Sequence, residues 1–316
     1  MMNHSRRTFL AACASAAVSL AARQRSFADD TPPKIGLGFS LYGMRSLKLA
    51  EALTLCREIG YDCVELPVMH QWPADSASFS TEQRQAFRKS LDGSGLGLSA
   101  LMENLPLLSD DRQHAAHLDR LKRAVQLARD LVPDQPPVVE TILGGKPDQW
   151  DAVKDRAVER LKNWAAAAAE AKVVVAIKAH VGGALHRPAD AAWLVKQIDS
   201  PWLKGAFDQS HFQLRGIGLA EAAEALLPHS VFIHVKDGRG TAERFEFLLP
   251  GEGTIDYVDL LRQAARLNYR GDVVVEVSGQ IHSRAGYDPA AAARKSYAAL
   301  APAWEKAGIE RSKEKP

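Results

Sequence analysis

The chain has 316 residues, 46% of them hydrophobic, with 40 basic and 38 acidic side chains and a formal net charge of +2. This near-neutral balance excludes the basic footprint expected of a nucleic-acid-binding protein and favours no polyanionic partner. The length suits one large α/β barrel or two ordinary domains.

The N-terminal segment, residues 1–28, has the features of an export signal. Arg6 and Arg7 precede the run "TFLAACASAAVSLAA", and "SFA" ending at Ala28 suits a signal-peptidase site. The pattern predicts a twin-arginine signal and a periplasmic location. A membrane helix is disfavoured because the run is short and rich in alanine. The segment holds four arginines and no acid, so residues 29–316 carry 36 basic and 38 acidic side chains. After cleavage we expect no membrane contact.

Residues 29–316 alternate short apolar runs with amphipathic stretches and show no linker. The runs predict strands at residues 34–41, 63–68, 96–103, 136–143, 173–180, 203–208, 231–237 and 272–278. The intervening patterns predict helices that include residues 49–60, 115–132, 150–171 and 188–198. Eight strand–helix units in one domain of this size indicate either a closed (β/α)₈ barrel or an open doubly wound sheet.

Local signals refine these elements. Gly60 is placed to end the first helix, and Pro188 to open the helix at 188–198. "PGEG" ending at Gly253 predicts a turn, with Thr254 as the cap of the next helix. Cys56 and Cys63 are too few for a disulfide framework, although they could form one bond.

Polar residues at the ends of the predicted strands decide between the two folds. An open sheet gathers its site at one switch point, whereas a closed barrel brings all the strand ends around one mouth. Seven different strands end in a charged or imidazole side chain: Glu65, Glu103, Glu140, Lys178, Asp208, His234 and Glu276. The sequence therefore predicts a (β/α)₈ TIM barrel that forms a single catalytic domain over residues 29–316.

Three successive strand ends supply a ligand set for a divalent cation. Asp208, His234 and Glu276 offer carboxylate, imidazole and carboxylate donors, which suit Mn²⁺, Mg²⁺, Co²⁺ or Zn²⁺. His211 follows Asp208 by three residues, and Lys236 shares the strand face of His234.

At these residues the chain resembles the sugar isomerase/epimerase superfamily, the xylose-isomerase-like barrels related to endonuclease IV. The resemblance covers the chain beyond the leader and rests on "DQSHF", "FIHVKD", "LLPGEGTIDYVDLL" and "VVVEVS" in this order. In the ketose epimerases of this family, a strand-five Glu, a strand-six Asp, a strand-seven His and a strand-eight Glu bind the metal. The last three match Asp208, His234 and Glu276, but Lys178 stands at the first position.

Lys178 departs from the family pattern, which uses the carboxylates of strands five and eight as its acid/base pair. Opposite unit charges 4 Å apart interact by about 4 kcal/mol at an effective dielectric of 20, and a divalent ion would repel an ammonium group twice as strongly. Three roles stay open. Lys178 could be a neutral base beside the metal, turn toward a carboxylate such as Glu140 or a substrate oxygen, or replace the metal. Glu140 could then supply the fourth metal ligand.

The resemblance implies an exported enzyme that isomerises or epimerises a small carbohydrate through an enediolate held by a divalent cation. Glu276 and Lys178 (or His180) would transfer the proton. Substrate-contact roles go to His211, Lys236, Glu103 and His282, although His211 could instead hold Asp208. Both Glu65 and Glu103 suit either the pocket or a helix cap. Because phosphosugars are mostly cytoplasmic, export favours a free or oxidised sugar.

Two other functions stay open. The same enolisation on a 3-keto glycoside would make the protein a lyase or hydratase, and a barrel without metal could bind a sugar without catalysis. An endonuclease role is disfavoured because the family's three-zinc cluster needs additional histidines on early strands. The sugar, the metal and the oligomeric state stay undetermined by the sequence.

Overall fold

The computed structural model describes residues 33–312 of the chain. The predicted leader and its boundary at residue 28 lie outside these residues. None of the described helices has both the length and the apolar character needed to cross a membrane.

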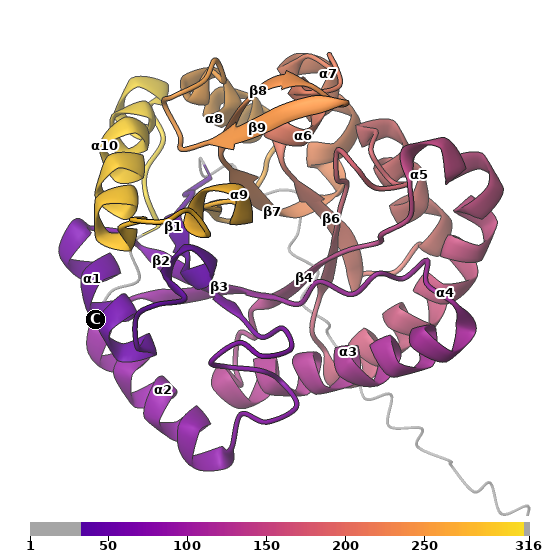
Figure 1. The fold of residues 1–316 in the computed structure, drawn as a ribbon, viewed down its shortest axis with the longest axis horizontal. Helices are drawn as coiled ribbons and strands as arrows, with labels where there is room; N and C mark the ends of the chain where they lie inside the picture. Colours follow the sequence, from indigo (N-terminus) through magenta and orange to yellow (C-terminus); the bar gives the residue numbers. More distant parts are fainter. Residues whose placement is uncertain (1–32, 313–316) are drawn as a thin grey trace, which may run out of the picture. The chain divides into compact units, whose positions relative to one another are not determined.

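Eight parallel strands close into a barrel in the order β1-β10-β7-β6-β5-β4-β3-β2, which confirms the predicted fold (Figure 1). The barrel strands are β1 (Leu37–Ser40), β2 (Cys63–Pro67), β3 (Gly97–Met102), β4 (Val138–Ile142), β5 (Val175–Lys178), β6 (Leu203–Phe207), β7 (Ser230–Val235) and β10 (Val273–Val275).

Helices surround the barrel and alternate with its strands. The outer helices are α1 (Leu49–Ile59), α2 (Thr81–Ser94), α3 (Asp111–Leu131), α4 (Trp150–Ala171), α5 (Pro188–Ile198), α7 (Leu219–Leu226), α8 (Tyr257–Arg266) and α10 (Pro289–Ala307). Gly60 caps α1 at a φ of 105°, a left-handed conformation that glycine adopts without strain. Pro188 opens α5 as predicted.

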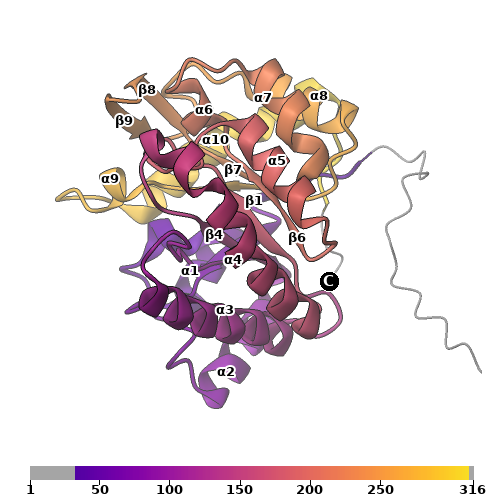
Figure 2. The ribbon, with the colours of Figure 1, turned by 90° about the vertical axis from the view of Figure 1, so that its right-hand side faces the viewer.

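Short elements decorate the loops between strands and outer helices. They are η1 (Leu41–Met44), η2 (Pro147–Gln149), η3 (Leu227–His229), α6 (Gln209–Gln213) and α9 (Gly279–His282). An antiparallel hairpin of β8 (Asp237–Thr241) and β9 (Arg244–Leu248) follows β7 and was not predicted from the sequence. Figure 2 shows the hairpin and α9 on the same side of the barrel.

The inside of the barrel has its own apolar layer, distinct from the larger core between strands and helices. One inward-facing residue from each of six strands forms this layer: Cys63, Ala100, Ala176, Ala206, Phe232 and Val274. Because strand side chains alternate, the residue two positions further along each strand faces the same interior, one level nearer the mouth. This layer is the floor of the site described below.

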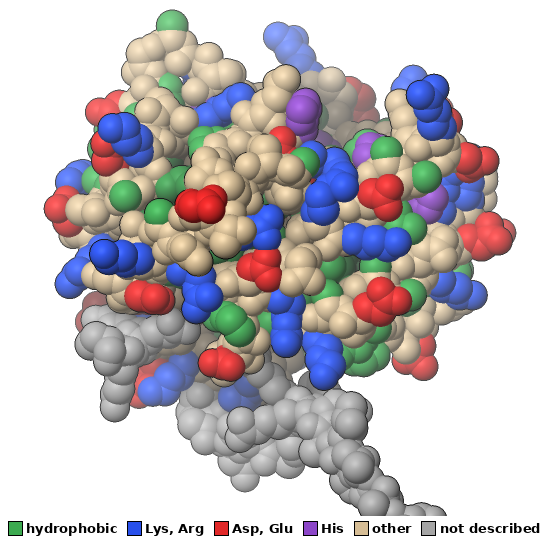
Figure 3. All heavy atoms as spheres, turned by 90° about the horizontal axis from the view of Figure 1, so that it is seen from below, with side chains coloured by type: hydrophobic (Ala, Val, Ile, Leu, Met, Phe, Trp, Pro, Cys, Tyr) green, Lys and Arg blue, Asp and Glu red, His purple; other side chains and the backbone are tan. Residues whose placement is uncertain are grey.

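The surface agrees with the near-neutral composition. In Figure 3, blue basic and red acidic side chains are interspersed over the face that is shown. Cys56 and Cys63 are buried free thiols, so they form no disulfide.

Candidate active site

Six of the seven predicted strand-end residues meet at the mouth. Five stand two positions beyond a floor residue: Glu65, Lys178, Asp208, His234 and Glu276. Glu140 joins them from β4, two positions beyond Val138, which packs against the floor. Strand alternation therefore points all six side chains into one layer, which forms a buried cluster at the mouth.

Glu103 is the exception. Its backbone follows Met102, and its carboxylate accepts hydrogen bonds from Arg120 Nη2 at 2.7 Å and Ser76 Oγ at 3.2 Å. Burial raises the pKa of Glu103 to about 7, although Arg120 and Ser76 act to lower it. The predicted substrate contact of Glu103 has no support from this geometry, because Glu103 belongs to an ion-pair network with Asp75 and Arg120.

His234 forms a buried ion pair. Its Nε2 lies 2.9 Å from Glu65 Oε2, and its Nδ1 lies 3.2 Å from Glu276 Oε2. Burial lowers the pKa of His234, but the two carboxylates outweigh burial and raise that pKa to about 9. Glu65, whose role was left open, thus holds the imidazole of His234 in place.

Lys178 turns toward carboxylates, which was the second of its three predicted roles. Its Nζ lies 3.1 Å from Glu140 Oε1, 3.1 Å from Glu276 Oε2 and 3.0 Å from His234 Nδ1. Although burial opposes the charge, Glu140 and Glu276 raise the pKa of Lys178, so the side chain is an ammonium group. The neutral base considered from the sequence is therefore not what this environment produces.

Lys236 is enclosed at the next level of β7. Its Nζ donates to Asp208 Oδ2 in a short hydrogen bond and to Glu276 Oε2 at 2.9 Å. It also lies over the ring of Phe247, 4.9 Å from the centroid. Only 1% of the Lys236 side chain is exposed, and its ammonium group binds carboxylates of the site. The predicted contact between Lys236 and a substrate is therefore not supported by this geometry.

His211 supports Asp208. The backbone N–H of Val181 donates to its Nδ1 at 3.2 Å, which leaves the proton of a neutral ring on Nε2, 3.5 Å from Asp208 Oδ2. Burial and Lys236 lower the pKa of His211 well below its ordinary value, so the ring is neutral. Of the two roles expected for His211, this geometry is that of a partner of Asp208, because the side chain is buried and faces that carboxylate.

Glu276 is the carboxylate of the cluster that reaches the opening. Its side chain is 13% exposed, whereas those of Asp208, Glu65 and Glu140 are 0% exposed. Its contacts with Lys178, Lys236 and His234 all fall on Oε2, and the described residues make no hydrogen bond to Oε1. These cations outweigh burial and lower the pKa of Glu276, so it is ionised with one free oxygen.

His180 lies beside the cluster at the mouth. Burial, with smaller contributions from Lys178 and Lys236, lowers the pKa of His180 to about 4. The N–H of Gly182 donates to its Nδ1 at 3.2 Å, so the neutral ring carries its proton on Nε2. His180 can therefore donate a hydrogen bond to a substrate oxygen at neutral pH.

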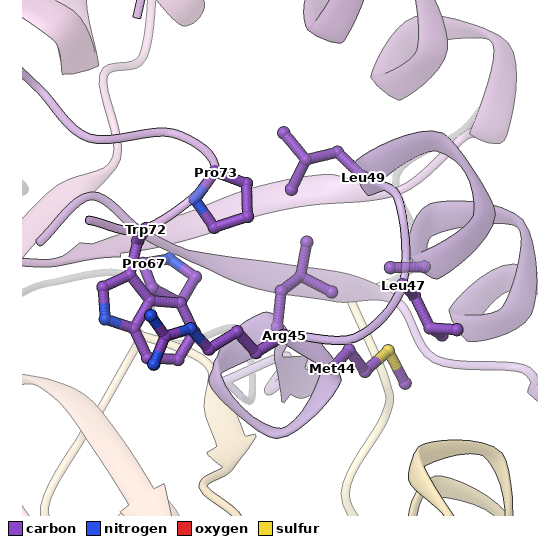
Figure 4. A pocket seen from close by; sticks show the side chains of 9 residues that line it. Met44, Arg45, Leu47, Leu49, Pro67, Trp72 and Pro73 are labelled. Atoms are coloured by element: carbon purple, nitrogen blue, oxygen red, sulfur yellow. The ribbon is translucent and has the colours of Figure 1, made fainter. Parts of the chain in front are cut away.

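Tyr42, Trp72 and His282 form an aromatic wall on one side of the mouth. Tyr42 stacks on Trp72 with ring centroids 4.9 Å apart, and His282 meets the Tyr42 ring edge-on at 4.6 Å. Figure 4 shows the Arg45 guanidinium beside Trp72, 4.7 Å from its centroid. Of these residues only His282 was predicted, because single aromatics in loops carry no period that would mark them.

The hairpin of β8 and β9, which was not predicted, covers part of the site. Phe247 of β9 packs against His211, with ring centroids 5.1 Å apart, and covers Lys236. The N–H of Phe247 donates to Gln280 Oε1 of α9 at 2.8 Å, which ties the hairpin to the loop after β10.

The predicted cation ligands come together, but ammonium groups already contact them. The donor atoms of Asp208, His234 and Glu276 lie within 4.8 Å of one another, as do those of Glu65, Glu140 and His234, and such oxygen and nitrogen donors suit a divalent ion. However, Lys236 bridges Asp208 and Glu276, and Lys178 lies among Glu140, His234 and Glu276. With both ammonium groups in place, these residues do not fit a divalent cation.

Glu140, the predicted fourth metal ligand, contacts Lys178 but lacks a well-directed hydrogen bond. Its Oε1 is 3.1 Å from Lys178 Nζ, yet neither of its buried oxygens receives a well-directed hydrogen bond. Burial raises the pKa of Glu140, although Lys178 acts to lower it.

Comparisons with known proteins agree with this architecture. An L-ribulose-5-phosphate 3-epimerase by name from Escherichia coli (strain K12) is 24% identical over 250 residues, 74% of this chain and 85% of its own. The 3-keto-D-glucoside 4-epimerase of E. coli superposes with a TM-score of 0.67 at 19% identity, covering 85% of this chain and 100% of that one. The IOLI protein with a bound zinc atom gives 0.73 at 16% identity, covering 86% and 99%.

At these identities the solved structures share the barrel fold with this chain. The family model described as "Xylose isomerase-like TIM barrel" matches residues 53–303, which include every residue of the cluster. The chain therefore belongs to the xylose isomerase-like TIM barrel family.

Proposed function

We propose that the chain is an enzyme that epimerises or isomerises a sugar by moving a proton at a carbon beside a carbonyl group. The observation that carries the proposal is the geometry of Glu276: its Oε2 lies within 3.2 Å of Lys178, His234 and Lys236, no described residue donates a hydrogen bond to Oε1, and the side chain is partly exposed at the mouth. A fixed carboxylate beside an opening has the geometry of a general base. The names of the E. coli relatives, both epimerases, support the same reaction class.

In this proposal Glu276 Oε1 removes a proton from the substrate carbon. The C–H electron pair forms a carbon–carbon double bond, and the carbonyl electron pair moves to oxygen to give an enediolate. A proton from water, added to the opposite face of the same carbon, gives the epimer. When Glu276 instead returns the proton to the former carbonyl carbon and the hydroxyl proton moves to the former carbonyl oxygen, the product is the isomer. His180 donates its Nε2–H to a substrate oxygen, and nearby Lys178 favours the negative charge of the enediolate.

The aromatic wall supports a sugar as the substrate. The C–H face of a sugar ring is apolar, and aromatic rings such as Tyr42 and Trp72 pack against such surfaces while their edges stay near water. His282 would then contact a sugar hydroxyl from the loop after β10. The substrate class we propose is a free or oxidised sugar, in line with the 3-keto-glucoside named for one relative.

Export through the twin-arginine route is part of the proposal and rests on Arg6, Arg7 and the apolar run that follows them. An enzyme outside the cytoplasm would meet sugars that are not phosphorylated. The metal dependence predicted from the sequence does not enter this proposal, because Lys178 and Lys236 already contact the predicted ligands.

Solvent exchange tests the reaction. The protein is incubated in D₂O with a panel of free sugars and 3-keto glycosides, and NMR follows loss of the proton beside the carbonyl. We expect exchange with at least one substrate and a decrease of about 10²-fold or more for Glu276→Gln, the loss typical of a general base. Glu243→Gln, the same change at an exposed glutamate of the hairpin loop, should exchange like the wild type.

The same experiment separates the alternatives. A conjugated double bond or a released aglycone would identify a lyase acting on a 3-keto glycoside. Saturable sugar binding without exchange or product would identify a non-catalytic sugar-binding barrel, and either result would overturn the epimerase proposal.

A further inference from the structure

The buried cluster encloses the ammonium groups of two lysines among its carboxylates. Four carboxylates converge at the mouth, those of Glu65, Glu140, Asp208 and Glu276. Two ammonium groups, those of Lys178 and Lys236, lie among them and bring two positive charges, the charge of one divalent ion.

Each predicted metal ligand is in contact with at least one of these two groups, and Glu276 contacts both. Lys236 donates to Asp208 and, at 2.9 Å, to Glu276. Lys178 lies 3.0 Å from His234 Nδ1 and donates to the same Glu276 oxygen at 3.1 Å. The distances to the carboxylate oxygens are those of direct hydrogen bonds, so no space for an ion and its coordination shell is left between these groups.

Both lysines are buried in these positions. Their side chains are 4% and 1% exposed, and the ring of Phe247 covers Lys236. A cation entering the cluster would meet two positive charges, and it would leave carboxylates of the cluster without their present partners.

We propose that Lys178 and Lys236 together take the place of the divalent cation, so that the folded protein binds none at this site and acts without one. The absence of metal binding follows from the cluster alone; the activity without metal also rests on the proposed sugar chemistry. The two lysines are positioning residues, because they act through Glu276 and the charge around it.

Metal titration is the direct test. The purified protein is treated with EDTA, dialysed and titrated with Mn²⁺, and binding is followed by calorimetry and by the loss of the free-ion EPR signal. The wild type should bind no stoichiometric Mn²⁺. Lys178→Glu replaces an ammonium by a carboxylate beside Asp208, His234 and Glu276, so it should bind one Mn²⁺ at least 10-fold more tightly than any wild-type binding, the scale on which changes around metal sites act.

A second variant and a control guard the interpretation. Lys178→Met removes the charge without adding a ligand and should also increase Mn²⁺ binding, which keeps the test open if Lys178→Glu does not fold. Lys162→Glu makes the same charge change at an exposed lysine of α4 and should leave binding at the wild-type level. Circular dichroism checks that each variant is folded.

Each outcome bears on the proposal. One Mn²⁺ per wild-type chain that is lost in Asp208→Asn would overturn it. It would also be overturned if the folded lysine variants bound no more Mn²⁺ than the wild type, because the lysines would then not be what keeps the ion out. Proton exchange that survives EDTA supports activity without metal, whereas failure of every sugar to exchange would contradict the proposed function and leave the binding result unaffected.

Discussion

At the residue scale, the site is organised around shared atoms. Glu276 Oε2 accepts from both lysines and faces His234 Nδ1, so three cationic side chains depend on one oxygen. His234 is also held from its other side by Glu65 at 2.9 Å. Substitution of any of these residues should therefore affect its neighbours, because groups in one ion-pair network are not energetically independent.

The ion pair between His234 and Glu65 predicts a dependence of stability on pH. The folded-state pKa of His234 is raised to about 9, above the unfolded value near 6.5, so its stabilisation is complete below pH 6.5 and lost as the pH rises through 9. The free energy of unfolding should fall by about 3 kcal/mol over this range. Urea unfolding at pH 6.5 and 9.5 measures the change.

Glu65→Gln is the matched test of that assignment. Without the carboxylate, the pKa of His234 falls and most of the pH dependence should disappear. The variant should also be less stable at pH 6.5 by roughly 3–5 kcal/mol, the cost of breaking a buried pair. Equal pH dependence in both proteins would show that another group titrates.

At the scale of elements, the sequence predicted the barrel more completely than the loops that cover it. The eight strands were predictable because short apolar runs end in polar residues at regular spacing. The direction of Glu103 was not, because the register between β2 and β3 shifts at Val64 and Glu65. That irregularity lets β3 contribute Met102 to the interior, so Glu103 falls outside the cluster.

The hairpin and the loop after it show a second limit. β8 and β9 are short and partly exposed, so they lack a strong apolar alternation, and the hairpin that supplies Phe247 was missed. The cap of α8 was predicted as Thr254, but the side chain of Asp256 accepts from Val258 and Asp259. Asp256 competes with Thr254 as an N-cap on equal chemical grounds, and only the chain path decides between them.

Asp237 holds the loop of residues 250–253 in place, which leads to a prediction for this element. Its carboxylate accepts from the N–H groups of Gly251 at 2.7 Å, Gly253 at 3.0 Å and Ile255 at 3.3 Å. Asp237→Asn replaces a charged acceptor by an amide, so we expect a loss of roughly 1.5–3 kcal/mol in unfolding free energy. Hydrogen exchange at these three amides should become faster.

Asp256→Asn is the control for this prediction. It makes the same substitution at the cap of α8, where asparagine caps as well as aspartate, and should change the unfolding free energy little. Unchanged exchange at Gly251 and Gly253 in Asp237→Asn would mean that the loop is held by other contacts.

At the scale of the whole molecule, the two ends of the barrel have different tasks. The end away from the mouth is tied together by the last described residues: Arg311 donates to Asp62 at 2.7 Å and to the Gly60 carbonyl at 2.6 Å. Trp304 Nε1 donates to the Ile35 carbonyl at 2.7 Å, which joins α10 to the start of β1. These contacts stabilise the end of the barrel away from the mouth, whereas the mouth holds the polar residues of the site. This division between the two ends is usual in this fold.

The protonation state of the cluster could not be predicted from the sequence alone. The positions of Lys178 and Glu276 on facing strands follow from chain order, but the charge of Lys178 depends on whether a carboxylate or a metal lies beside it. Only the three-dimensional placement of Glu140 and Glu276 around its Nζ decides this.

The last prediction concerns where the whole protein acts. Arg6→Lys combined with Arg7→Lys keeps the charge of the leader but removes the pair that the twin-arginine route reads, so we expect the protein to stay in the cytoplasm with residues 1–28 attached. Cell fractionation and N-terminal sequencing measure both effects. Arg23→Lys combined with Arg25→Lys makes the same chemical change nearer the cleavage site and should be exported and cleaved normally. Normal processing of the Arg6 and Arg7 variant would assign the leader to another pathway, and retention of both variants would mean that total arginine content, not the pair, matters. Export would bring the folded barrel to sugars that lack phosphate groups, so the result also decides which substrates belong in the exchange assay.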